Sequence, residues 1–374
     1  MVVVQCVDQI DEPARFSFGF ESVYFFFLEI PMKKSLIALA VLAASGAAFA
    51  QSTVTIYGLL DANINSTKSG NVTNTKIDSG GIQTSRFGFK GSEDLGGGLK
   101  ANFKLESGLN IDTGASGSYT NPYTNASSAS VFSRQSWVGV SGGFGEIQLG
   151  KMWTPYDDLV GSGIAVFNAN IFSPVAYVFS SAANYNDRPG NSIYYATPDF
   201  GGFSGAVMYS LGENKTATTG AGNITSFRIG YEGGPVAVGL GYQTEKTSGA
   251  APTTAKFTQL NGSYDLGVAK LLAAYGNVKD LGATPKTNEY QIGVDVPVSS
   301  ALTLSAGYAT SKDTGLKVPL VGSEIKRTGY ALGALYALSK RTNLYAGLNN
   351  SKTTQSGVAD AKTNVYALGV RHTF

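Results

Sequence analysis

Cysteine, histidine and charge are all scarce in this chain of 374 residues. The one cysteine, Cys6, permits neither an internal disulfide nor a cysteine metal cluster, and the one histidine, His372, cannot complete a His-rich metal site. Charged residues make up 14% of the chain, against roughly 25% in soluble domains. The net charge of +2 argues against binding to a nucleic acid, because contacts with its phosphates call for a concentrated basic surface. These absences exclude nucleic acid as a partner, and no metal or other cofactor is expected.

An export signal occupies residues 32–50. Residues 32–34 (Met-Lys-Lys) give a positive start, Ser35 to Ala47 is an apolar run, and Ala48-Phe49-Ala50 fits a cleavage site between small residues. The mature chain is therefore predicted to begin at Gln51. A short apolar run with these flanks favours a signal peptide over a buried helix.

The signal peptide divides the chain into three parts. Residues 1–31 precede it and are interpreted as an upstream extension from a misassigned start codon. Residues 51–374 are the mature domain, which has 25 basic and 21 acidic residues, a balance of +4, and no cysteine.

The mature chain contains no run of eighteen apolar residues, which excludes a transmembrane helix. Apolar residues alternate instead. From Leu99 to Ile111, apolar side chains share one face of a strand while lysines, asparagines and Glu106 share the other. The pattern recurs near Phe203 and Leu302. Alternation alone also fits a soluble sandwich with one wet face.

The spacing of the breaks separates these two folds. Sixteen strands are predicted, starting near residues 53, 82, 99, 131, 145, 191, 203, 224, 236, 256, 268, 287, 301, 327, 342 and 364. Short turns such as Asp94 to Gly98 alternate with long polar connections such as Asn65 to Gly81, Asp112 to Ser130 and Thr244 to Ala255. This alternation predicts an all-β, sixteen-stranded antiparallel transmembrane β-barrel with short periplasmic turns and long external loops.

Several motifs of the mature chain resemble the general trimeric porins of Gram-negative outer membranes, in the proteobacterial branch that ends in His-x-Phe. They are Thr53-Val-Thr-Ile-Tyr-Gly58, Ser85-Arg-Phe-Gly-Phe-Lys-Gly-Ser-Glu-Asp-Leu-Gly-Gly-Gly-Leu-Lys100, Phe103-Lys-Leu-Glu-Ser-Gly108, Ser339-Lys-Arg-Thr-Asn-Leu-Tyr345 and Gly369-Val-Arg-His-Thr-Phe374. The resemblance implies a homotrimer among outer-membrane lipids. It also implies that small hydrophilic solutes and ions diffuse passively through the protein. Independently, sixteen strands enclose an aqueous channel.

The same resemblance implies an inward-folded constriction loop, and Met152 to Gly190 is the longest connection. Arg86 and Arg134 match the family's wall arginines, Arg188 is a third candidate, and Glu106 matches a wall carboxylate. Asp157 and Asp158 are expected on the loop, opposite these bases. Strand parity also points Arg86 and Lys90 into the lumen if Phe87 and Phe89 meet lipid. Alternatively, these charges, Lys104 included, pair and stiffen the wall.

Leu159 to Asn186 carries no charged residue, and Asp187 follows only at its end. With basic wall residues and a balance of +4, a weak preference for anions is predicted. Phe374 resembles the terminal aromatic signal that the barrel-insertion machinery reads.

Two other functions fit an outer-membrane barrel. A non-conducting structural barrel would lack conductance. A barrel hydrolase would need a nucleophile with an orienting base, whereas His372 lies at the chain end with no such motif nearby. We therefore expect no enzymatic activity.

Overall fold

The computed structural model describes residues 53–121, 127–160, 163–282, 284–315 and 324–374. Contacts divide the chain into two units, Met1–Phe49 and Ala50–Phe374. The predicted upstream extension, the signal peptide and the N-terminus at Gln51 lie outside the described residues.

Strands dominate the described residues. They are β1 (Thr53–Ser69), β2 (Val72–Ser79), β3 (Arg86–Gly96), β4 (Leu99–Gly108), β5 (Ser118–Thr120), β6 (Ser127–Ala129), β7 (Gln135–Gly142), β8 (Gly145–Lys151), β9 (Ser192–Ala196), β10 (Phe203–Leu211), β11 (Asn223–Gly233), β12 (Val236–Lys246), β13 (Thr254–Asp265), β14 (Lys270–Leu281), β15 (Thr284–Pro297), β16 (Leu302–Thr314), β17 (Ile325–Ala337), β18 (Thr342–Gln355) and β19 (Val358–Thr373). The described part of the connection between β8 and β9 includes the short helical turns α2 (Pro155–Val160), η3 (Val166–Asn168), η4 (Pro174–Tyr177) and α3 (Ser181–Asn184).

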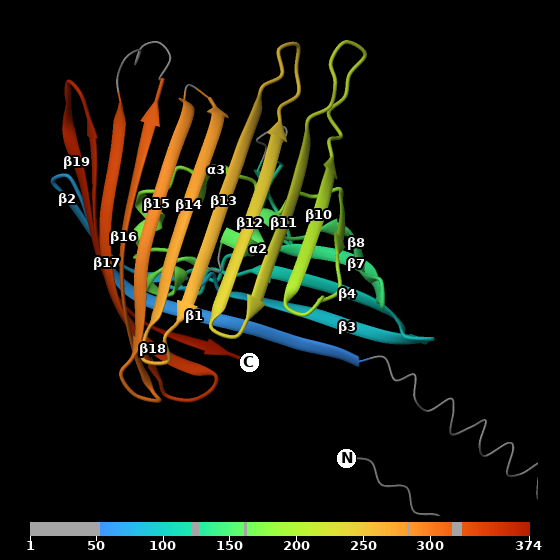
Figure 1. The fold of residues 1–374 in the computed structure, drawn as a ribbon, viewed down its shortest axis with the longest axis horizontal. Coiled ribbons are helices and arrows are strands. Elements are labelled where there is room, and N and C mark those ends of the chain that lie inside the picture. The colour runs from blue at the N-terminus through green and yellow to red at the C-terminus, as the bar shows by residue number, and fades with distance from the viewer. Residues whose placement is uncertain (1–52, 122–126, 161–162, 283, 316–323) are drawn as a thin grey trace, which may run out of the picture. The chain divides into compact units, whose positions relative to one another are not determined.

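All strands except β5 and β6 form one antiparallel sheet that closes on itself, since β1 pairs with β19 from Leu59–Thr373 to Ser69–Thr363. The other edge of β1 is shared, with β3 beside Thr53–Leu59 and β2 beside Ala62–Ser69. Strands β2 and β3 are thus two halves of one barrel strand. Sixteen strands surround the interior, as predicted, and closure leaves no backbone edge facing lipid (Figure 1).

The connections alternate in length as the sequence predicts. Strands β11 and β12, for example, pair up to Gly233–Val236 around a two-residue turn. Figure 1 shows the short turns at the end of the barrel where the C-terminus lies, and the long connections at the opposite end. The short turns therefore mark the periplasmic end.

The predicted strand starts agree with the structure to within three residues except at β3, β7 and β19. The connection expected from Asn65 to Gly81 is largely strand, because β1 continues to Ser69 and β2 follows a tight turn at Gly70, where φ is +59°. The predicted loop 112–130 likewise contains the β5–β6 hairpin. In β2, β5 and β6 most side chains on both faces are polar, so backbone pairing persists where the hydrophobic alternation has ended.

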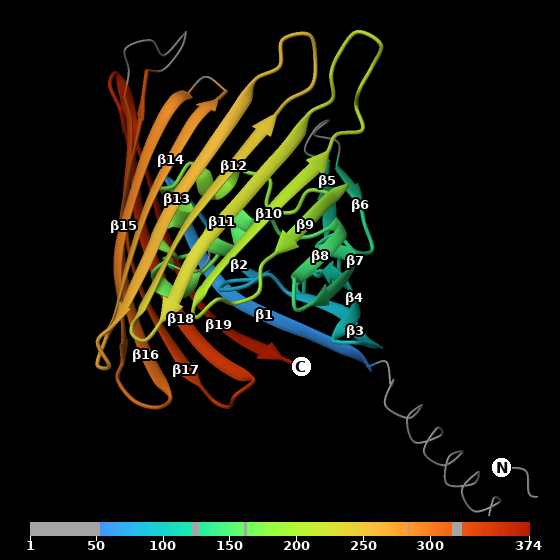
Figure 2. The ribbon, with the colours of Figure 1, turned by 45° about the vertical axis from the view of Figure 1, so that its right-hand side comes forward.

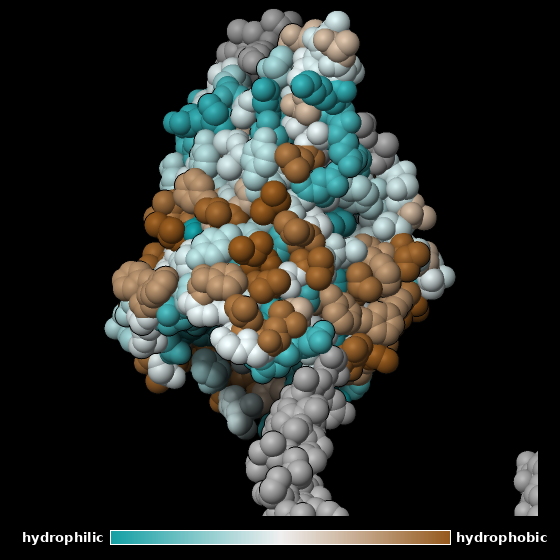
Figure 3. All heavy atoms as spheres, turned by 90° about the vertical axis from the view of Figure 1, so that its right-hand side faces the viewer, coloured by the Kyte–Doolittle hydropathy of each residue, from teal (hydrophilic) through white to brown (hydrophobic). Residues whose placement is uncertain are grey.

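The outer face of the wall is apolar. Its exposed side chains include Phe87, Ile229, Leu260, Ile292 and Leu332. In Figure 3 apolar residues form a band across the middle of one side, with hydrophilic residues above it. Tyrosines also pair across strands, as with the half-buried Tyr275 and the exposed Tyr290, whose ring centroids lie 5.2 Å apart. Such a band, with aromatic residues, is how a barrel meets lipid.

Among the described residues, no helix is long and apolar enough to cross a membrane.

Candidate functional site

The connection from Met152 to Gly190, here called the inward loop, folds into the barrel (Figure 2). Its first helix, α2, packs against β11, β12 and β13, and its 3-10 turns η3 and η4 pack against β16 and β17. The apolar core of the protein lies where the loop meets the wall, with Val166 and Phe172 of the loop packed beside Tyr345 of β18. The loop therefore narrows the interior, as the resemblance implies.

Polar side chains on the inner wall hold the loop backbone. Ser226, Gln291, Ser305 and Glu289 accept hydrogen bonds from the backbone N–H groups of Tyr156, Ala165, Val166 and Ser181, at 3.0, 3.1, 2.9 and 3.0 Å. Asn261, Asn349 and Ser311 donate to the carbonyls of Leu159, Ser173 and Val178, at 2.7, 2.9 and 2.6 Å. A buried loop without its own ladder must find such partners.

Two wall glycines make room for the loop. A Cβ atom added to Gly347 of β18 would lie 2.3 Å from the Phe172 ring, and one added to Gly293 of β15 would lie 2.2 Å from the Cβ of Ala165. Both distances are far below van der Waals contact, so the loop can approach only a wall that lacks side chains at these positions.

A basic cluster lies on the wall between β3 and β8. Glu106 of β4 sits at its centre, with 2% of its surface exposed. Arg134 Nε lies 2.8 Å from Glu106 Oε1, while Lys104 Nζ and Arg86 Nε lie 3.7 and 4.0 Å from Oε2. Tyr57 donates its hydroxyl to Oε2 at 2.9 Å. One carboxylate thus faces three cations, and the cluster is electropositive.

The basic cluster continues onto the inward loop through Trp153. The guanidinium carbons of Arg188 and Arg134 lie 4.1 and 5.3 Å from the centroid of the Trp153 ring. Lys151 donates to the carbonyl oxygen of Arg188 at 2.5 Å, and its ammonium lies 4.5 Å from the Tyr119 ring centroid. Stacking on aromatic faces holds these cations in place. Arg134 also pairs with Glu106, and Arg188 Nη2 lies 2.9 Å from Asp187 Oδ2.

Sequence reasoning missed Lys151, Trp153 and the two tyrosines as members of this cluster. The only signal available was the position of Lys151-Met-Trp153 at the junction of a strand and the longest connection. Lys90, on the inner face of β3, also lies at the cluster, with its ammonium 5.4 Å from the Tyr57 ring centroid.

Asp157 and Asp158 lie elsewhere on the loop. Asp157 accepts a hydrogen bond from the Tyr185 hydroxyl at 2.5 Å, and Asp158 Oδ2 lies 3.8 Å from Arg228 Nε of β11. Within the described part of the chain, neither carboxylate forms an ion pair with Arg86 or Arg134. The structure therefore brings Arg86, Arg134, Arg188 and Glu106 together and places the two aspartates against the β10–β13 wall.

Burial changes the protonation of both aspartates. Removal from water raises the pKa of Asp157 to about 7, and the neighbouring negative charge of Asp187 adds to this increase. Burial also raises the pKa of Asp158, although the positive charge of Arg228 opposes it. The loop therefore carries less negative charge at neutral pH than its sequence indicates.

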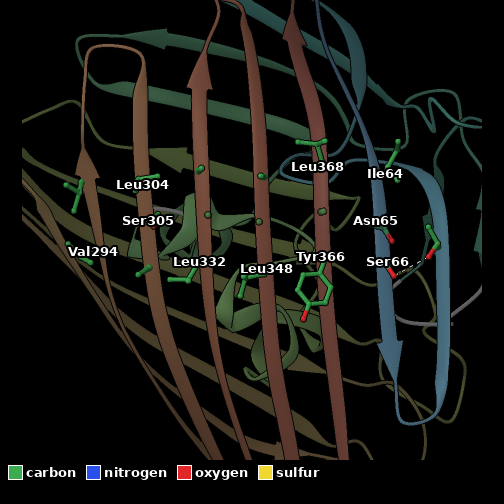
Figure 4. A pocket seen from close by; sticks show the side chains of 18 residues that line it. Ile64, Asn65, Ser66, Val294, Leu304, Ser305, Leu332, Leu348, Tyr366 and Leu368 are labelled. Carbon is green, nitrogen blue, oxygen red and sulfur yellow. Dashed lines mark hydrogen bonds between the residues drawn. The ribbon is translucent and has the colours of Figure 1, made fainter.

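Two apolar hollows on the wall lie outside this site. One, of about 720 Å³, is open to the outer surface and spans β15 to β19 and β1 (Figure 4). Its apolar lining includes Ile64, Leu304, Leu332 and Leu368, which are exposed, and Leu348, which is half-buried. It belongs to the lipid-facing side of the wall rather than to the interior.

Comparison with known proteins identifies the fold and the channel. Residues 36–356 match the family model described as Gram-negative porin. The chain is 36% identical to outer membrane porin protein 32 of Delftia acidovorans over 355 residues, which cover 91% of this chain and 95% of that protein. It is 30% identical to an outer membrane porin protein of Bordetella pertussis, covering 92% and 100% of the two chains.

A solved structure shows the same architecture. The anion-selective porin from Comamonas acidovorans superimposes with a TM-score of 0.71 at 29% identity, and the match covers 87% of this chain and all of that one. The closed sixteen-stranded barrel, its apolar outer band and its inward loop agree with that assignment, and channels of this family are not enzymes. The chain belongs to the Gram-negative porin family, as a multi-pass β-barrel of the outer membrane that forms a diffusion channel.

Proposed function

We propose that this channel passes small hydrophilic solutes and ions with a preference for anions, and that the inward loop and the basic cluster form its narrowest section. The observation that carries this proposal is that six cations gather where, among the described residues, two carboxylates pair with them: Glu106 of the wall and Asp187 of the loop. The cations are Arg86, Lys90, Lys104, Arg134, Lys151 and Arg188. In confined water such a set favours anions.

The acidic groups strengthen the imbalance. Asp157 is buried and partly protonated near neutral pH, and Asp158 is paired with Arg228. Glu289, buried on the inner wall, accepts two hydrogen bonds from Ser181 of the loop. These carboxylates anchor the loop or offset a single base, so they do not oppose the basic cluster across the pore. The similarity to an anion-selective porin supports the same preference.

The test is the reversal potential of the purified protein in a planar bilayer under a salt gradient. Changing both Arg86 and Arg134 to Ser should shift the potential toward cations and raise the conductance. The shift should be largest at low salt, because the screening length falls from about 10 Å at 0.1 M to about 3 Å at 1 M.

Lys340→Ser is the control, since this lysine lies exposed in the turn between β17 and β18. It should leave selectivity nearly unchanged. Equal shifts per charge removed in the double variant and the control would show that net charge matters and position does not. The assignment of Arg86 and Arg134 to the narrowest section would then be withdrawn.

We further propose that the chain assembles as a homotrimer among outer-membrane lipids. Family membership supports this assembly, and the open hollow across β15 to β19 and β1 offers an apolar surface on which a second copy could pack. Burying such a surface against another barrel would replace lipid contacts with packing against protein.

Two proposals concern biogenesis. Phe374 is proposed as the signal for the barrel-insertion machinery; it lies 46% exposed at the end of β19 and exchanges two backbone hydrogen bonds of 3.1 Å with Gly58 of β1. Residues 32–50 are proposed as a cleaved signal peptide that leaves Gln51 first, two residues before β1 begins.

A further inference from the structure

The barrel wall is interrupted between β2 and β3. Residues 80–85, here called the wall break, leave the sheet where β1 passes from its pairing with β2 to its pairing with β3. Ile82, in the middle of the wall break, is 1% exposed and packs into the core with Val166 and Phe172 of the inward loop. The wall break therefore lies beneath the loop.

One buried carboxylate holds the wall break. Asp61 of β1 has no exposed surface. Its Oδ1 accepts hydrogen bonds from the Gly81 N–H at 3.1 Å and the Tyr345 hydroxyl at 2.5 Å, and its Oδ2 accepts from the N–H groups of Ile82 and Gln83 at 3.0 and 2.8 Å. Hydrogen bonds to a charged acceptor are among the strongest in proteins, and these four satisfy the carboxylate.

Close approach at Gly81 makes this arrangement possible. A Cβ atom at that position would lie 2.1 Å from the Tyr345 hydroxyl oxygen. The tyrosine reaches Asp61 across the barrel closure, from β18 to β1, only because residue 81 has no side chain.

The tip of the inward loop docks on the same segment. The N–H groups of Asn170 and Ile171 donate to the carbonyls of Ile82 and Gly81 at 3.1 and 3.3 Å, and the Asn170 side chain donates to the Gly80 carbonyl at 3.0 Å. These three hydrogen bonds tie the loop tip to the backbone of the wall break. Its position depends on residues that Asp61 holds from the other side.

The wall break also leads directly into the basic cluster. Ser85 is fully buried, and its hydroxyl both accepts from the Asp61 N–H at 2.9 Å and donates to the Asp61 carbonyl at 3.2 Å. Arg86 follows at once and donates to the carbonyl of Thr84 at 3.2 Å. Contacts with Asp61 therefore fix the start of β3 and the backbone of Arg86.

We propose that Asp61 is a positioning residue of the channel, whose carboxylate sets the width of the narrowest section by fixing the wall break to which the loop tip is bound. This inference rests on the proposed function, in which the inward loop narrows the pore. Asp61 acts through hydrogen-bond geometry rather than through its field in the lumen, since it is fully buried and has four donors.

The test compares four variants of the full-length protein. Asp61→Ala removes every acceptor. Asp61→Asn removes the same charge but keeps one acceptor oxygen. Its new NH₂ group is itself a donor, so it cannot accept the hydrogen bonds that the lost oxygen accepted. Tyr345→Phe removes one donor, and Asn170→Ala alters only the loop tip. Asp313→Asn is the matched control, a buried wall carboxylate, 2% exposed, that binds Thr287 and Arg327 of neighbouring strands.

The readouts are permeation of neutral sugars of increasing size into liposomes and closing events in single-channel recordings. Neutral sugars report width without sensing charge. Asp61→Ala should lose discrimination between a monosaccharide and a disaccharide and should show about a tenfold rise in transient closures, as expected when a few charge-assisted hydrogen bonds are lost. Asn170→Ala should reproduce both effects. Asp61→Asn and Tyr345→Phe should give sugar discrimination and closure rates between those of Asp61→Ala and the wild type. The control Asp313→Asn should match the wild type.

Other outcomes overturn the proposal. If both Asp61 variants shift the reversal potential equally and leave sugar permeation unchanged, Asp61 acts by charge. If Asp61→Ala does not fold, the Asn170→Ala and Tyr345→Phe channels decide, and wild-type sugar discrimination in both refutes the positioning role. Absence of any anion preference, with the sugar results as expected, would refute the selectivity proposal alone.

Discussion

Single residues decide the charge of the pore, and Glu106 is the most informative of them. It is buried among Arg134, Lys104 and Arg86 and accepts the Tyr57 hydroxyl. Its negative charge therefore holds the cations in place and also offsets part of their positive charge. Removing the charge while keeping the shape separates these two effects.

Glu106→Gln should strengthen the preference for anions, because three cations lose their common counter-charge. It should also lower the heat stability of the folded barrel by about 1–3 kcal/mol, the loss expected when a buried hydrogen-bonded charge is removed. Reversal potential and the temperature at which the folded form disappears on gels measure the two effects. Glu93→Gln, on an exposed position of β3, should change neither; a weaker anion preference in Glu106→Gln would contradict the cluster's role.

Asp157 predicts a dependence on pH. Its pKa of about 7 lies above that of an ordinary carboxyl, through burial and the nearby Asp187, while the Tyr185 hydroxyl and Arg188 favour the ionised form. As pH rises through 7 the loop gains a negative charge, so anion preference should fall. The folded state holds this proton more tightly than the unfolded chain, so stability should also fall between about pH 4 and 7.

Reversal potentials measured from pH 5 to 9 check this prediction. Asp157→Asn should remove the step near pH 7 and keep the low-pH selectivity throughout. If Asp157→Asn keeps the change in reversal potential near pH 7, another titratable group causes it.

At the scale of elements, the wall is fitted to the loop it surrounds. Gly347→Ala should displace Phe172, because the new methyl group would lie 2.3 Å from that ring. Overpacking of this kind costs about 1–3 kcal/mol, and here the loop can yield while the strands cannot. We expect an unchanged barrel with a less discriminating, noisier pore, measured by sugar permeation and single-channel recording.

Gly262→Ala is the matched control, since a Cβ at that strand position meets only the Ala237 carbonyl at 3.7 Å. Equal effects of the two substitutions would show that strand glycines matter for the sheet and not for the loop.

The sequence predicts elements well where burial imposes a period and poorly where it does not. Alternation with short turns locates most strands, because lipid and lumen demand opposite side chains at neighbouring positions. Strand β2 is missed because each of its faces carries one apolar residue, Val72 or Ile77, among polar ones, so no alternation marks it. The partners of Asp157 and Asp158 are missed because Tyr185 and Arg228 lie 28 and 70 residues away, and only the folded loop brings them near.

At the scale of the whole molecule, the prediction concerns assembly. Detergent-extracted protein should migrate as a trimer that heat dissociates, and conductance in bilayers should be blocked in steps of three. The reason is that separate pores, each with its own inward loop, would share one assembly through their outer walls. Stable monomers with full conductance would agree with a diffusion channel and would refute the proposed trimer.

The closure of β1 on β19 has a consequence for how the barrel comes into being. The two strands stand at opposite ends of the unit Ala50–Phe374, so their pairing is among the most non-local contacts in it and belongs among the slow steps of folding. Until β19 arrives, both edges of the sheet are unpaired, and no water in a bilayer can satisfy them. A chain that lacks β19 therefore cannot close the sheet, so the barrel can seal only after this strand has been made.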